Sequence, residues 1–211
     1  RQTYLRWCRD AILLAAELGA PGFGGPLGAM SRSDYDQPQR RSYLTAWLQE
    51  AIHLLGEAAR AVGLQFLLWE PTPLSRELSS TLAETARLTA AFNEASPIPV
   101  RLCLDVGHAC HPEATGEDAD PYAWIRRLGS EAALIHVQQT DGKGDRHWPF
   151  TPAFNEQGII RVPDVVQAMQ EGGCRELPIV FEVFHAFEAP DETVLDELTA
   201  SVEHWRQALD R

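Results

Sequence analysis

Short apolar segments alternate with amphipathic helical segments along the whole chain, and this alternation limits the folds open to it. Strands are expected at residues 22–26, 64–69, 100–104, 132–137 and 178–183. Helical periodicity precedes, separates and follows them, at residues 3–18, 42–62, 81–96, 120–129, 163–172 and 191–209. Apolar strands that alternate with helices are typical of a parallel sheet covered by helices. We therefore expect an α/β fold in a single domain over residues 1–211.

Two of these helices carry apolar stripes that should face the core. The first stripe comprises Leu5, Cys8, Ile12, Leu13 and Ala16, and the last comprises Val194, Leu195, Leu198, Val202, Trp205 and Leu209. The segment 139–161 is expected to be a long loop. Loops of that length in a compact domain are usually lids or binding loops, so this one is a candidate for function.

The charge balance restricts the partners of the chain. It has 18 Lys and Arg against 30 Asp and Glu, a formal net charge of −12. Such a surface repels nucleic-acid phosphates and anionic lipid, so neither nucleic acid nor a membrane is an expected partner. The four cysteines form no CxxC pair, which is typical of reduced thiols and favours a cytoplasmic protein. No apolar run is long enough to span a bilayer, and no signal peptide opens the sequence.

Four of the expected strands end on a residue that can bind a metal. These residues are Glu70, Asp105, His136 and Glu182, separated by 35, 31 and 46 residues, about one strand–helix unit each. The carboxyl ends of parallel strands meet on one side of a barrel, so the four side chains should converge. Three carboxylates and an imidazole brought together would repel and desolvate one another unless a cation joined them.

Each of these residues alone has a simpler explanation, since a single Glu at a strand end often forms an ion pair and a single His after an apolar run often lies in the core. The four in register are more specific. Oxygen ligands with one nitrogen favour Mn²⁺, with Mg²⁺, Co²⁺ or Zn²⁺ also compatible.

The segments around these positions resemble those of a known superfamily. Glu70-Pro71, Asp105-Val106-Gly107-His108, Ile135-His136-Val137 and Phe181-Glu182-Val183 are similar to the xylose-isomerase-like sugar isomerases and epimerases, which are metal-dependent (β/α)₈ TIM barrels. Further segments resemble the tetrulose-phosphate (erythritol-type) isomerases and epimerases of that superfamily, namely Glu70-Pro71-Thr72-Pro73-Leu74, His147-Trp148-Pro149-Phe150-Thr151-Pro152 and Val183-Phe184-His185.

The resemblance implies a role for each strand-end residue. It makes Glu70, Asp105, His136 and Glu182 the metal ligands, and it makes Glu70 and Glu182 the acid/base pair on opposite faces of the substrate. It also implies that His108 contacts a substrate oxygen. Proton transfer beside a ketose carbonyl passes through an enediolate, which a divalent cation stabilises. One carboxylate can remove the proton and a second can return it. Return of the proton to the same carbon gives an epimer, and return to the neighbouring carbon gives an isomer.

Several basic residues are candidates for substrate binding. Lys143, Arg146 and His147 in the 139–161 loop could clamp a phosphate, although the two cations could equally pair with neighbouring Asp residues in a solvated loop. Arg76 is another candidate anion contact, and it replaces an acidic residue that many relatives with free-sugar substrates carry. His185 is a candidate second-layer or substrate residue. The expected substrate is a small sugar or sugar phosphate.

Five strands are too few for a closed eight-stranded barrel. In the superfamily the metal ligands come from the last four strands, so we expect these residues to be the C-terminal five strand–helix units, with three N-terminal units absent. An open barrel exposes strand edges, so the isolated chain is expected to form a homodimer or to aggregate.

Two other functions fit the same architecture. An apurinic endonuclease would need a multi-zinc cluster and a basic face, which the charge of −12 disfavours. A non-catalytic sugar-binding module would not need both Glu70 and Glu182.

Overall fold

The computed structural model describes residues 2–210, which form two compact units. The first unit ends at Cys103, and the second begins at Leu104. Strand β3 (Val100–Asp105) contains this boundary.

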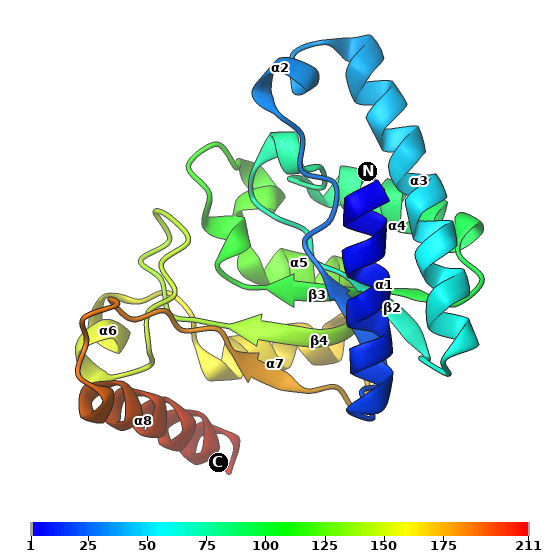
Figure 1. Ribbon diagram of the computed structural model, residues 1–211. Helices are drawn as coiled ribbons and strands as arrows, with labels where there is room; N and C mark the ends of the chain where they lie inside the picture. The colour runs from blue at the N-terminus through cyan, green and yellow to red at the C-terminus, as the bar shows by residue number, and fades with distance from the viewer. Residues whose placement is uncertain (1, 211) are drawn as a thin grey trace. The chain divides into compact units, whose positions relative to one another are not determined.

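The first unit contains the first two strands and the helices around them (Figure 1). Its elements are α1 (Gln2–Glu17), β1 (Gly22–Gly25), α2 (Arg32–Tyr35), α3 (Pro38–Ala61), β2 (Phe66–Trp69) and α4 (Leu82–Ala95). Strand β2 pairs in parallel with β1 and with the start of β3, with Leu67 opposite Phe23 and Val100. The expected parallel arrangement is therefore confirmed in this unit.

Local sequence signals explain how these elements begin and pack. The Thr81 hydroxyl accepts the Glu84 backbone N–H at 3.2 Å, as expected of an N-cap, and starts α4. Trp69 at the end of β2 and Phe92 on α4 are fully buried and pack edge to face, with ring centroids 4.7 Å apart. This contact fixes the position of Trp69, which is the last residue of β2 and directly precedes Glu70.

The second unit continues the alternation. Its helices and strands are α5 (Pro121–Leu128), β4 (Ala132–Val137), α6 (Pro152–Gln157), α7 (Val162–Glu171), β5 (Ile179–Phe181) and α8 (Asp191–Leu209). Strands β4 and β5 are parallel, with His136 opposite Val180. Their arrows point the same way in Figure 1, towards the loop that follows β4. Helices α5 and α7 pack against each other.

The expected loop 139–161 is more ordered than the sequence indicates. Gln139 and Trp148 form an antiparallel bridge with two backbone hydrogen bonds, and α6 occupies residues 152–157. Phe150 is buried in this segment and packs against Phe181 and Trp205.

The two expected apolar stripes are only partly buried. On α1 only Ile12 is buried, and Leu13 is 51% exposed. On α8 the expected apolar stripe buries Trp205, while Leu195 and Leu209 are exposed. Val180 of β5 is exposed as well. Periodicity identifies the apolar side of a helix, but it cannot supply the neighbour needed to cover that side.

Within residues 2–210, no helix combines the length and the apolar character needed to cross a membrane.

Candidate metal centre

The candidate metal centre of the second unit lies where β3, β4 and β5 deliver polar side chains. Asp105 is the last residue of β3, His136 lies near the end of β4, and Glu182 follows β5. Backbone hydrogen bonds hold these positions in register, from Val106 N–H to the His136 carbonyl at 3.3 Å and from Glu182 N–H to the Val137 carbonyl at 3.0 Å. The parallel register therefore brings the three side chains to one edge.

The side chains of these three residues approach one another closely. His136 Nδ1 lies 3.0 Å from Glu182 Oε2 and 3.9 Å from Asp105 Oδ2. Asp105, His108 and Glu182 each place one potential ligand atom within 4.8 Å of the others. The cluster thus combines carboxylate oxygens with imidazole nitrogens, the donor set expected of a hard or borderline divalent cation.

The electrostatics of the cluster also suit a cation. Burial, and after it the neighbouring Glu182 carboxyl, raises the pKa of Asp105 well above its usual range. The His136 imidazole lowers the pKa of Glu182 to about 2 and keeps that carboxyl ionised. Asp105 Oδ2 is buried and accepts no hydrogen bond within residues 2–210. A buried carboxylate oxygen without a hydrogen bond destabilises the fold unless a cation or another donor contacts it. These residues therefore fit a divalent metal.

A second group of polar residues surrounds Asp105. The Gln138 side chain lies between Asp105, Asp145 and His147, and it is fully buried. His147 places Nε2 3.1 Å from Asp145 Oδ2 and Nδ1 3.1 Å from the Glu182 carbonyl oxygen. Nδ1 also lies 3.1 Å from the Gln138 amide nitrogen, so this ring nitrogen has one acceptor and one donor beside it. Burial alone would lower the pKa of His147, but the hydrogen bond and charge of Asp145, the Glu182 carbonyl and the Asp105 charge together outweigh it and raise the pKa to about 9.

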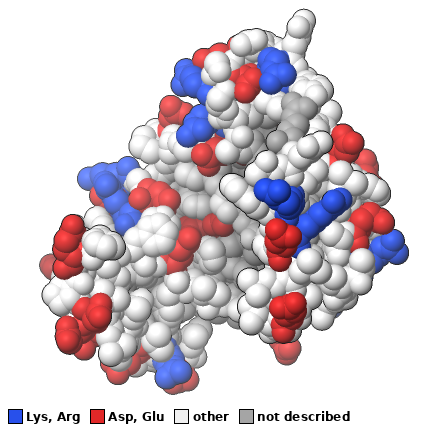
Figure 2. Space-filling view, in the orientation of Figure 1, with Lys and Arg blue, Asp and Glu red and all other residues white. Residues whose placement is uncertain are grey.

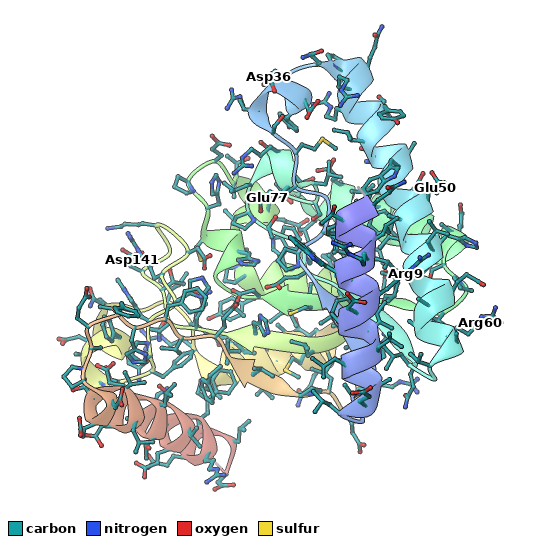
Figure 3. All side chains as sticks on the ribbon, viewed as in Figure 1. Arg9, Asp36, Glu50, Arg60, Glu77 and Asp141 are labelled. Atoms are coloured by element: carbon teal, nitrogen blue, oxygen red, sulfur yellow. The ribbon has the colours of Figure 1, made fainter. Side chains whose placement is uncertain are left out.

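The residues predicted to bind phosphate lie on the loop after β4, where Figure 3 labels Asp141. Arg146 donates two hydrogen bonds to the Asp141 carboxylate, at 3.1 and 3.2 Å, and its guanidinium lies over the Trp148 ring. These bonds lower the pKa of Asp141. The structure thus shows the pairing with a neighbouring Asp that was one of the two interpretations. Among the described residues, the Lys143 ammonium has no hydrogen bond or ion pair.

The remaining candidates have defined surroundings. His108 Nε2 lies 3.7 Å from Asp145 Oδ2, and His185 Nε2 lies 2.8 Å from Glu197 Oε2 on α8. In the first unit Glu70 is buried directly after β2, and its N–H bonds to the Gly25 carbonyl. Arg76 in that unit donates to the Met30 carbonyl and pairs with Glu77. The participation of Glu70 in the metal centre stays a prediction.

Gln138 is a residue of this site that no sequence pattern above singles out. It lies two residues after His136, so strand periodicity would place both side chains on the same face, and this signal could have identified it.

The chain matches known proteins along nearly its whole length. The family model described as "Xylose isomerase-like TIM barrel" matches residues 1–208. D-erythrulose 1-phosphate 3-epimerase of Brucella abortus (strain 2308) is 30% identical over 212 residues, covering 100% of this chain and 68% of that protein. A crystal structure of a Rhodospirillum rubrum protein is 34% identical with a TM-score of 0.86, covering 95% of this chain and 66% of that one.

More distant structures share the fold. D-psicose 3-epimerase, solved in the presence of D-fructose, is 17% identical with a TM-score of 0.67, covering 99% of this chain and 71% of that one. The chain thus spans about two thirds of the length of the proteins it matches.

Proposed function

Because this chain belongs to the xylose isomerase-like TIM-barrel family, we propose that it carries the metal and proton-transfer centre of a ketose 3-epimerase or isomerase. The observation that supports this most directly is the cluster of Asp105, His136 and Glu182 at the carboxyl ends of three consecutive strands. Active sites of TIM barrels are built at those ends. The expected TIM-barrel fold is confirmed by the family match, and the chemistry is our proposal.

Asp105, His136 and Glu182 would hold the metal, with Glu70 as the predicted fourth ligand. A bound divalent cation would stabilise negative charge on the substrate carbonyl oxygen. Glu182 is ionised and only partly buried, so it can reach a substrate and accept a proton from the carbon beside the carbonyl. Glu70 would return the proton from the other face, which inverts that carbon. The name of the Brucella relative favours epimerisation at carbon 3 over isomerisation.

The same relative favours a phosphorylated ketose as substrate. Lys143 is the best candidate for a phosphate contact, because its ammonium forms no ion pair or hydrogen bond among the described residues, although its charge acts on Asp141. Arg146 would have to release the Asp141 carboxylate before it could bind phosphate. Phosphate oxygens can accept two hydrogen bonds from the guanidinium, as the Asp141 carboxylate does. His108, His147, His185 and Arg76 remain candidate substrate contacts.

Removal of the metal tests the proposed function. We expect dialysis against EDTA to abolish proton exchange between solvent and D-erythrulose 1-phosphate, and Mn²⁺ or Co²⁺ to restore it. Deuterium incorporation followed by NMR reports the exchange at a named carbon. Full exchange after exhaustive chelation would contradict a metal mechanism. Metal binding with no exchange into any phosphorylated or free ketose would instead favour a sugar-binding module.

A double substitution tests the phosphate contact. Lys143→Ala with Arg146→Ala should raise KM for a phosphorylated ketose about tenfold or more, because a charge-assisted hydrogen bond contributes roughly 1.5–3 kcal/mol. The KM for the free ketose should change little. Arg127→Ala with Arg175→Ala removes the same charge from exposed positions of the second unit and serves as the control. Equal effects on both substrates would exclude the phosphate contact.

A further inference from the structure

Gln138 is the most enclosed polar side chain next to the candidate metal centre. It follows β4 directly, and none of its surface is exposed. Its amide nitrogen lies 2.9 Å from Asp105 Oδ1 and 2.7 Å from Asp145 Oδ1, while its amide oxygen accepts the His147 backbone N–H at 2.5 Å. The amide therefore joins the end of β3 to the loop after β4.

The neighbours of Gln138 fix the orientation of its amide group. A backbone N–H can only donate, so the atom facing His147 N must be the oxygen. The amide nitrogen then faces Asp105 Oδ1 and Asp145 Oδ1, which accept from it. An amide nitrogen has two hydrogens, which the two carboxylates accept, and the same nitrogen also lies 3.1 Å from His147 Nδ1. Every polar atom of this buried side chain is satisfied in one orientation only.

This orientation has a consequence for Asp105. Its Oδ1 accepts two hydrogen bonds, from Gln138 and from the Gly107 backbone N–H. Its Oδ2 accepts none within residues 2–210, although the side chain is completely buried. The two donors therefore lock the rotation of the carboxylate and leave Oδ2 on the side of His136, 3.9 Å from Nδ1.

We propose that Gln138 is a positioning residue, which holds Asp105 Oδ1 so that Oδ2 remains available as a metal ligand. The inference rests on the proposed function, because it assigns Asp105 to the metal. Hydrogen bonds from outer residues orient ligands and set metal affinity, typically by a factor of 10–100. By binding Asp145 as well, Gln138 would connect the metal ligand to the loop that carries His147, Lys143 and Arg146.

The space around the amide supports this assignment. A Cβ atom on Gly107 would overlap the Gln138 amide carbon and nitrogen and Asp145 Oδ1. The φ angle of Gly107 is −75°, a value that any residue can adopt, so backbone conformation does not require glycine here. Glycine at 107 leaves room for the amide beside Asp105.

Mn²⁺ affinity of the purified chain provides the test. Gln138→Met keeps the approximate length of the side chain and removes both donors. We expect it to weaken Mn²⁺ binding 10–100-fold, as measured by titration with electron paramagnetic resonance detection of free Mn²⁺. We also expect kcat to stay reduced at saturating Mn²⁺. Gly107→Ala is a second variant that displaces the amide without altering it, and it should weaken Mn²⁺ binding in the same direction.

Gln139→Met is the matched control. Gln139 is equally buried, but its amide bonds to Asn155 Oδ1 and to the backbone of Ile160 within the loop. Its substitution should lower thermal stability and change Mn²⁺ affinity less than threefold. Wild-type affinity in folded Gln138→Met and Gly107→Ala would overturn the positioning role. If the wild-type chain itself binds no divalent ion, the proposed function fails instead, so the two failures are distinguishable.

Discussion

At the scale of single residues, substitution of Glu182 tests the proposed proton transfer most directly. Glu182→Gln keeps the size of the side chain but removes its ability to accept a proton. We expect kcat to fall roughly hundredfold or more, the range that general acid–base catalysis contributes. The far-UV circular dichroism spectrum should be unchanged. Mn²⁺ binding, measured in parallel, separates loss of the base from loss of a ligand. Glu188→Gln, at an exposed position farther along the same loop, should behave as wild type.

The strand-end residues could be predicted because a parallel sheet brings equivalent positions together whatever lies between them. Asp105, His136 and Glu182 therefore needed only the positions of three strands. The contact between Gln138 and Asp145 could not be predicted in the same way, because it depends on how the loop after β4 folds back. Lys143 and Arg146 show the same limit, since a charge pattern does not reveal that Arg146 binds Asp141.

At the scale of elements, α8 is fixed to the loop after β4 by a buried hydrogen bond. Ser201 Oγ accepts the Phe150 backbone N–H at 2.8 Å and donates to the Glu197 carbonyl at 2.7 Å. Ser201→Ala leaves that buried N–H without a partner, which should cost about 1–3 kcal/mol of unfolding free energy. Urea denaturation followed by tryptophan fluorescence measures this loss. Thr199→Ala, on the exposed side of α8, is the control, and an equal effect of both substitutions would exclude the anchor.

The five strands and most helices were predicted from periodicity, turn residues and caps. Helix α6 was missed because it has six residues, too few to show a helical period. The helix begins at Pro152, and a proline in the first turn is a helix-start signal. This signal is weak by itself and gains weight only from the burial of Phe150.

At the scale of the whole molecule, net charge and exposed apolar surface act against each other. The formal charge of −12 opposes association of two copies. Helix α1 favours association, because Trp7 and Leu14 share one of its faces, Leu18 directly follows it, and the three side chains are 65%, 55% and 76% exposed. Figure 2 shows acidic side chains spread over the face in view, with basic residues in smaller groups among them. Salt should screen the repulsion while leaving apolar attraction intact.

We therefore expect self-association that strengthens as the salt concentration rises, measured by sedimentation velocity between roughly 20 and 500 mM NaCl, a range over which the Debye length falls about fivefold. Leu14→Glu with Leu18→Glu should abolish it by placing charge on the α1 face. Gln170→Glu with Gln207→Glu adds the same charge at exposed positions of α7 and α8, so it controls for net charge alone. If both pairs reduce association equally, repulsion governs it and α1 is not the contact. A monomer at every salt concentration would contradict the role of α1 altogether.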